Sequence, residues 1–171
     1  MEIQCSSFLL RPWQLDDTSS LCKHANNSKV AENLRDIFPF PYTIEDAEFF
    51  ITSIASSKSN LIMAIAVNGS AVGAIGIYPQ TGINQKSAEL GYWLGEHYWG
   101  KGIITEAVNA IVYYTFQNLD VNRIYASVFE RNHASMRVLE KCGFTREAIH
   151  YKAVVKNNLV MDEYLYVKLY P

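Results

Sequence analysis

Apolar and β-branched residues fall into seven short runs along the chain, each bounded by turn-forming or charged residues. This pattern predicts strands over residues 3–10, 61–67, 71–78, 87–94, 123–129, 144–155 and 161–170. Asn68-Gly69 lies between the second and third runs, and Asn-Gly between β-prone segments is a strong hairpin signal. Gly73 and Gly76 in the third run indicate either that another backbone approaches this strand closely or that the strand contains a bulge. We therefore expect a sheet of about seven strands.

Between these runs the apolar residues recur at helical spacing. The spacing predicts helices over residues 18–25, 28–35, 43–53, 103–118 and 132–143, which makes four to five helices around the sheet. Pro39 and Pro41 should keep the second helix short of residue 38, because proline lacks the backbone donor and restricts the residue before it. In the third helix, we expect Phe49, Phe50 and Ile54 to face the core.

The segment from Ser87 to Phe129 reads as strand, loop, helix and strand. Such a unit requires the two strands, 87–94 and 123–129, to run parallel with a right-handed crossover. Gly100 and Gly102 in its loop permit a turn whose backbone amides point at one anion, and the following helix adds the positive end of its dipole. The spacing fits neither a Walker loop nor a dinucleotide-binding fingerprint, so we expect a phosphorylated ligand of another kind.

This loop resembles the pyrophosphate loop of the GNAT N-acetyltransferase superfamily, which holds acetyl-coenzyme A. The family pattern begins with Gln or Arg, where this chain has His97. The resemblance implies acetyl-coenzyme A as co-substrate and assigns its binding to the loop and to a second segment described below. The predicted binding residues are Trp93, Leu94, His97, Tyr98, Trp99, Gly100, Lys101, Gly102, Ile103, Asn132 and Ser135.

The second segment runs from Asn132 to Phe144 and resembles the family's Asn-x-x-Ser helix, which ends in Gly-Phe. In the family the Asn side chain meets the pantetheine arm, and many members carry a tyrosine general acid seven residues later. Here Leu139 stands at that position, which leaves Ser135 as the candidate that stabilises or protonates the thiolate. Ser135 equally suits a purely local role in capping the helix.

Four further fragments, in the family's order, resemble the ribosomal-protein-alanine N-acetyltransferase branch. They are Leu10-Arg11-Pro12, the Pro-Tyr-Thr sequence at 41–43, the strand at 88–94 and the closing strand at 162–166. The resemblance covers nearly the whole chain. It implies a single GNAT-type domain over residues 1–171 of the α+β (α/β) class, with a mixed, mostly antiparallel sheet that is splayed at two parallel strands.

Glu89 is the candidate general base, because it shares a face of its strand with Gly91 and Trp93 and could look into the acceptor groove. The alternative is a carboxylate paired with Lys86 or another cation. Lys101, Arg137 and Lys141 could reach phosphates or could only face water. These two alternatives stay open at the level of sequence.

Composition and cysteine and histidine spacing limit which binding partners are expected. With 15 basic and 17 acidic side chains the net charge is −2, which argues against a general nucleic-acid or membrane surface. The three cysteines (Cys5, Cys22, Cys142) and four histidines lack metal-ligand spacing, so no metal site is expected. The cysteine pattern and the lack of an apolar leader predict a cytoplasmic protein. Either a monomer or a homodimer is compatible with the sequence.

The function that follows is transfer of an acetyl group to a primary amine by direct attack in a ternary complex. The branch resemblance favours a protein N-terminal α-amine, and the family places acceptor contacts in segments 30–45 and 152–160. A small-molecule amine such as an aminoglycoside, a polyamine or a metabolite is the first alternative. A non-catalytic acyl-coenzyme A binding module is the second, because Leu139 replaces the usual tyrosine.

Overall fold

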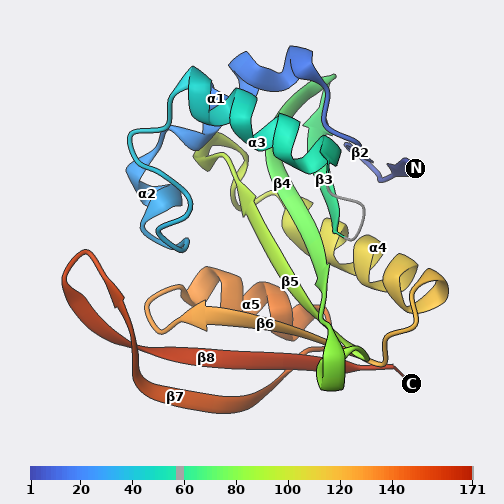
Figure 1. Ribbon diagram of the computed structural model, residues 1–171, viewed down its shortest axis with the longest axis vertical. Helices are drawn as coiled ribbons and strands as arrows, with labels where there is room; N and C mark the ends of the chain where they lie inside the picture. The colour runs from blue at the N-terminus through green and yellow to red at the C-terminus, as the bar shows by residue number, and fades with distance from the viewer. Residues whose placement is uncertain (57–59, 171) are drawn as a thin grey trace.

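The computed structural model describes residues 1–56 and 60–170 and contains one eight-stranded sheet (Figure 1). The strand order is β1-β2-β3-β4-β5-β6-β8-β7, with every neighbouring pair antiparallel except β5 and β6. The strands are β1 (Ile3–Gln4), β2 (Leu9–Arg11), β3 (Leu61–Val67), β4 (Ser70–Pro79), β5 (Ser87–Leu94), β6 (Arg123–Phe129), β7 (Thr145–Lys156) and β8 (Leu159–Leu169). The α-helices are α1 (Thr18–Ala25), α2 (Ser28–Ala31), α3 (Ile44–Ser56), α4 (Ile103–Asn118) and α5 (His133–Lys141), and three 3-10 turns accompany them.

Three predictions need correction. The strand expected over 3–10 is a small hairpin in which Ile3 pairs with Leu10, so the sheet has eight strands where about seven were expected. The helix expected over 28–35 ends at Ala31, because the amides of Asn33 and Leu34 bond three residues back and tighten the chain into turns. Phe49, expected in the core, is 76% exposed, whereas Phe50 on the same helix meets Trp13 edge-on.

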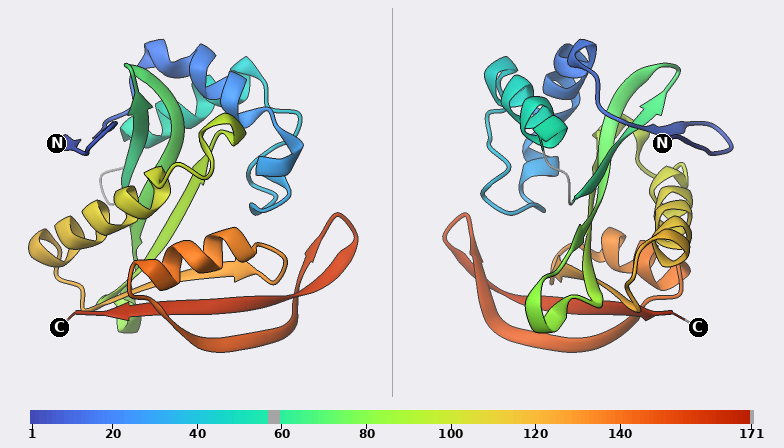
Figure 2. Two further views of the ribbon diagram at one scale, coloured as in Figure 1. Left: turned by 180° about the vertical axis from the view of Figure 1, so that it is seen from behind. Right: turned by 45° about the vertical axis from the view of Figure 1, so that its right-hand side comes forward.

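Two layers of helices cover the sheet (Figure 2). Helices α4 and α5 pack on one face and close the main core, to which they contribute residues such as Ile111 and Leu139. On the other face, α1 and α3 form a smaller cluster around Leu21, Tyr42 and Ile51. Along β4, a Cβ on Gly73 would lie 2.4 Å from the Trp93 carbonyl oxygen, which confirms the predicted close approach.

The parallel strands β5 and β6 separate soon after they begin. They pair at Ser87–Arg123, Ala88–Ile124 and Glu89–Tyr125, and no further β5–β6 pair follows within the described residues. Figure 1 shows the two strands leaving a common base and diverging. Because β5 stays paired with β4 through Leu94, the segment 90–94 turns its other edge toward the opening. The predicted splay between parallel strands is therefore confirmed.

Across the residues that the structure describes, every helix is too short or too polar to cross a bilayer.

Candidate active site

The loop after β5 leads into the N-terminus of α4 through a 3-10 turn, η3 (Glu96–Tyr98). Gly100 and Gly102 have φ angles of +74° and +79°, and a Cβ at either position would meet nothing within 4 Å. Gly102 is the N-cap of α4, and the first helical bond runs from the Glu106 amide to its carbonyl. The amides of residues 103–105 precede that bond and lack a side-chain cap. This open, donor-rich turn at the positive end of a 16-residue helix suits a diphosphate.

Other predicted binding residues lie at the end of β5 and in the loop that follows it. Leu94 is buried in the main core, and its carbonyl accepts a 2.7 Å hydrogen bond from the Trp99 indole. Trp93 turns its side chain to the opposite face, where its ring lies 5.5 Å from that of Phe38. Backbone, rather than the Trp93 side chain, therefore borders the opening between β5 and β6. Lys101 extends over the Tyr98 ring, with its Nζ 5.3 Å from the centroid.

At the start of α5, Ser135 takes part in the helix cap through its backbone amide, while its hydroxyl contacts strand β5. The Asn132 side chain accepts a 3.1 Å bond from the Ser135 amide, which caps the helix. The Ser135 hydroxyl is at the same time 2.7 Å from the hydroxyl of Tyr92 on β5. Sequence reasoning missed Tyr92, although strand alternation places it with Leu90 and Leu94 on the face toward α5. The hydroxyl pair connects β5 to α5 across the opening.

Burial raises the pKa of Tyr92 well above its ordinary value, and this outweighs the opposing effect of its bond to Ser135. Tyr92 therefore keeps its proton at neutral pH and can act as a donor. Leu139, at the position of the family's tyrosine, is completely buried in the main core. The chain thus offers a Tyr92–Ser135 pair from β5 and α5, where relatives of the resembled family use a tyrosine of the helix.

Glu89 lies on the opposite face of β5 and forms an ion pair with Arg35, from the loop after α2. A second contact, between Arg35 Nη1 and Glu89 Oε2, measures 3.4 Å. The predicted alternative partner, Lys86, instead pairs with Asp120. Burial, reinforced by the nearby Glu89 charge, raises the pKa values of Tyr78 and Tyr125 on the flanking strands. Glu89 is therefore set among two tyrosines and one guanidinium.

Hydrogen bonds connect the loop over residues 32–42 to two neighbouring segments, the β6–α5 connection and the end of β7. Arg131, in the connection from β6 to α5, donates a 2.6 Å bond to the carbonyl of Glu32. Lys156, at the end of β7, donates a 2.7 Å bond to Asp36, and its side chain is only 7% exposed. The Lys156–Asp36 bond joins the two segments, 30–45 and 152–160, that were expected to contact the acceptor.

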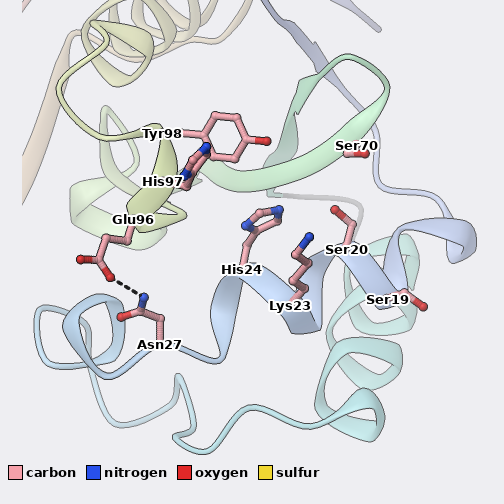
Figure 3. Close-up of a pocket in the computed structure, with 9 residues that line it drawn as sticks. All are labelled: Ser19, Ser20, Lys23, His24, Asn27, Ser70, Glu96, His97 and Tyr98. Atoms are coloured by element: carbon pink, nitrogen blue, oxygen red, sulfur yellow. Dashed lines mark hydrogen bonds between the residues drawn. The ribbon is translucent and has the colours of Figure 1, made fainter.

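Two cavities are lined in part by β5 or by the loop that follows it. The larger, of about 910 Å³, lies between α1 and the loop after β5. Figure 3 shows Lys23 and His24 of α1 facing His97 and Tyr98 across it, beside the hydrogen bond from Asn27 to Glu96. Neither Glu89 nor Ser135 lines it. The smaller cavity, of about 300 Å³, lies on the Glu89 face of the sheet and is lined by Arg123, Tyr125 and Ser127 of β6, among others.

The remaining predicted cations face outward. Arg137 and Lys141 are exposed on α5, and neither forms an ion pair with any residue in 1–56 or 60–170. They stay candidates for an outlying phosphate. Over the same described ranges, no group of three His, Cys, Asp or Glu side chains is arranged to hold a metal ion.

Residues 7–145 match the family model described as Acetyltransferase (GNAT) domain. The Bacillus subtilis protein Probable N-acetyltransferase YjcK is 36% identical over 127 residues, which are 74% of this chain and 65% of that protein. The Escherichia coli ribosomal-protein-serine acetyltransferase is 32% identical over 84 residues, 49% of this chain and 47% of that protein.

Solved structures agree in fold. A GNAT-family acetyltransferase from Bacillus anthracis superposes with a TM-score of 0.85 at 26% identity, covering 99% of this chain and 98% of that one. RimL, a ribosomal L7/L12 α-N-protein acetyltransferase in complex with coenzyme A, superposes with a TM-score of 0.88 at 20% identity and the same coverage.

Proposed function

The chain belongs to the GNAT acetyltransferase family and is an N-acetyltransferase, and from this premise we propose that it transfers the acetyl group of acetyl-coenzyme A to a primary amine by direct attack. The observation that carries the proposal is the opening between β5 and β6. A donor-rich helix N-terminus lies at its upper end, the Tyr92–Ser135 hydroxyl pair spans one side, and Glu89 faces the other side. One ligand can therefore enter from each face.

The co-substrate is held chiefly by backbone. The amides around Gly100, Gly102 and Ile103 would bind the diphosphate, and the unpaired edge of β5 over 90–94 would align the pantetheine arm. Fixing the thioester beside the amine supplies much of the rate, since oriented pairs reach effective molarities of about 10⁵ M or more. Lys101, Arg137 and Lys141 would add positive charge near the phosphates.

Two proton movements complete the reaction. The amine attacks the thioester carbonyl carbon as Glu89 takes one of its protons, and the carbon–sulfur bond then breaks. The departing thiolate receives a proton from the Ser135 hydroxyl, which takes one in turn from Tyr92 across the 2.7 Å bond. Tyr92 regains its proton from solvent before the next turnover. The raised pKa of Tyr92 keeps that proton available throughout the neutral range.

For the acceptor we propose a protein N-terminal α-amine. The E. coli relative at 32% identity acts on a ribosomal protein, and the Lys156–Asp36 bond brings together the two segments that we expect to contact such an acceptor. A small-molecule amine is the second candidate, because the cavity on the Glu89 face measures only about 300 Å³. A polyamine or aminoglycoside fits less well, since Arg35 and Arg123 lie on this face.

A cytoplasmic site of action is also our proposal, which the three free thiols support.

The test is a free-thiol assay with acetyl-coenzyme A and a panel of amines that includes short peptides, amino acids, spermidine and an aminoglycoside. We expect thiol release to be fastest with the peptides. A thermal-shift comparison of acetyl-coenzyme A with ATP and NAD should show stabilisation by the first alone. Equal stabilisation by all three nucleotides, or no thiol release with any amine, would contradict the proposal.

A further inference from the structure

The ion pair between Arg35 and Glu89 occupies the carboxylate that the proposed reaction needs. Glu89 lies on the acceptor face of β5 and is 20% exposed, while the Arg35 side chain is 61% exposed. Both guanidinium ends engage it, one in the short ion pair and one at 3.4 Å. An incoming amine is mostly protonated at neutral pH. It must therefore replace the Arg35 guanidinium on Glu89. The carboxylate can then take the first proton, pass it to solvent, and take the second as the amine attacks.

Arg35 can leave Glu89 by moving its side chain, whereas its backbone is held in place. Its loop is anchored by the bond from Arg131 to the carbonyl of Glu32 and by the bond from Lys156 to Asp36. The Phe38 ring, a few residues further on, packs against Trp93 of β5. The Arg35 backbone is thus held close to Glu89. A displaced guanidinium stays within reach of whatever has displaced it.

A second guanidinium points to the same chemistry. Arg123 lines the 300 Å³ cavity next to Tyr125, the residue that pairs with Glu89 in the sheet. Its Nη2 donates a 2.6 Å bond to Glu147, but its Nη1 is buried without a partner in the described structure. The Arg123 guanidinium therefore adds positive charge to the wall of a cavity on the Glu89 face of the sheet, which favours an anionic group there.

We infer that the acceptor carries an anionic group close to its amine, and that Arg35 reads this group after it leaves Glu89. The amine takes the place of Arg35 on the Glu89 carboxylate, and the acceptor's own carboxylate takes the place of Glu89 on Arg35. In the ternary complex Glu89 is then paired with the amine and Arg35 with the acceptor's carboxylate, so that the Arg35 guanidinium is not left without a partner. This inference rests on the proposed function and narrows its substrate class.

Two sources share this chemistry. A free α-amino acid has its carboxylate next to the amine, and a protein N-terminus has one when its first residues include Asp or Glu. The protein's own Glu163 offers a competing destination for Arg35, since its charge also acts on that side chain. Glu163 is already in contact with His150 at 3.3 Å. If Arg35 turned to Glu163 instead, an acceptor anion would bring no advantage.

The test compares matched acceptors in the thiol assay with the full-length protein. Alanine is paired with alaninamide, and the peptide Ala-Asp-Ala-amide with Ala-Asn-Ala-amide. We expect kcat/KM to be about fivefold higher for the anionic member of the preferred pair, in line with one ion pair to a side chain that is 61% exposed. The pair that shows the preference identifies the source. The amine of alaninamide is the less basic, so the bias within that pair runs against the inference.

Variants assign the preference to Arg35. In Arg35→Gln the two members should fall within about twofold of each other, and Arg35→Lys should keep part of the preference because it keeps the charge. The control is Lys86→Gln, which removes a cation from the ion pair with Asp120 at the start of β5 and should keep the full preference. A melting curve confirms that each variant is folded.

Equal kcat/KM within both pairs, or a preference that Arg35→Gln leaves intact, would overturn the inference while leaving the acetyltransferase proposal in place. No thiol release with any amine would instead contradict the proposed function, and this inference with it.

Discussion

The two faces of β5 are built in different ways. On the proposed cofactor side, the candidate binding groups come from backbone and from contiguous segments, namely the loop over 95–103 and the start of α5. On the acceptor side they are charged side chains from distant parts of the chain: Arg35 and Glu89 are 54 positions apart, and Lys156 and Asp36 are 120 apart. The cofactor side is thus a local structure, whereas the acceptor side exists only once the fold has formed.

This difference predicts that the two sides can be damaged separately. The largest effect is expected for Glu89→Gln, which keeps the shape of the side chain and removes its basicity. We predict that kcat falls about 100-fold or more, as is usual for a general base, while the acetyl-coenzyme A Kd stays unchanged. Steady-state kinetics and calorimetry measure the two quantities. Asp120→Asn, which neutralises a carboxylate in an exposed ion pair, is the control. An unchanged kcat in Glu89→Gln would exclude it as the base.

The Tyr92–Ser135 pair spans the opening and should belong to the chemistry rather than to either binding side. We predict that Tyr92→Phe and Ser135→Ala each lower kcat about tenfold or more. The double variant should be little worse than the more impaired single variant, because both residues serve one proton. Because the pKa of Tyr92 is raised, the loss should be constant between about pH 6 and 9. Fully additive effects on kcat would show that the two hydroxyls act independently.

The cofactor side can be weakened alone at Gly102. Gly102→Ala places a Cβ at φ +79°, a conformation that L residues seldom adopt, and so should distort the turn that holds the diphosphate. We predict an increase of about tenfold in the acetyl-coenzyme A Kd, measured by calorimetry.

Gly69→Ala is the matched control, since Gly69 has φ +84° and equally open surroundings in the β3–β4 turn. It should lower the melting temperature by a similar amount without changing the Kd. Equal Kd values for the two variants would argue against a role of this loop in binding.

The smallest effect is expected at the anchor of the acceptor loop, where the two partners are unequally buried. Lys156 is 7% exposed and Asp36 is 81% exposed. Asp36→Asn leaves a buried ammonium with a weaker partner and should lower the unfolding free energy by about 1 kcal/mol. Lys156→Met should change stability less, because the remaining Asp36 is hydrated. Chemical denaturation compares the two, and a larger loss in Lys156→Met would reverse the assignment of the buried partner.

The same contrast explains what could be predicted from the sequence. The strands at 61–67, 87–94 and 123–129 and the helix at 103–118 were predicted to the residue, because local periodicity and turn signals define them. The Ser6-Ser7 turn between β1 and β2 lacks Gly or Pro and was missed. Phe49 was placed in the core as part of an apolar stripe with Phe50 and Ile54, but it is 76% exposed and lies outside the face of α3 that packs against α1.

For the site, the glycine turn and the capped α5 were visible in sequence, since each lies within one short segment. The Arg35–Glu89 pair and the Tyr92–Ser135 pair were not, because each joins two segments through tertiary structure. Strand alternation alone places Glu89 and Tyr92 on opposite faces of β5. It cannot identify Arg35 and Ser135 as the residues that contact them.

The most direct test of the central claim is a titration of the ¹⁵N-labelled protein with coenzyme A, followed through the backbone amide resonances. We predict that the largest shifts fall on residues 98–104, at the turn that leads into α4, with a second group on 90–94 along the open edge of β5. Shifts that cluster instead on residues 19–27, in α1 and just after it, around the 910 Å³ cavity, would place the diphosphate elsewhere and contradict the claim.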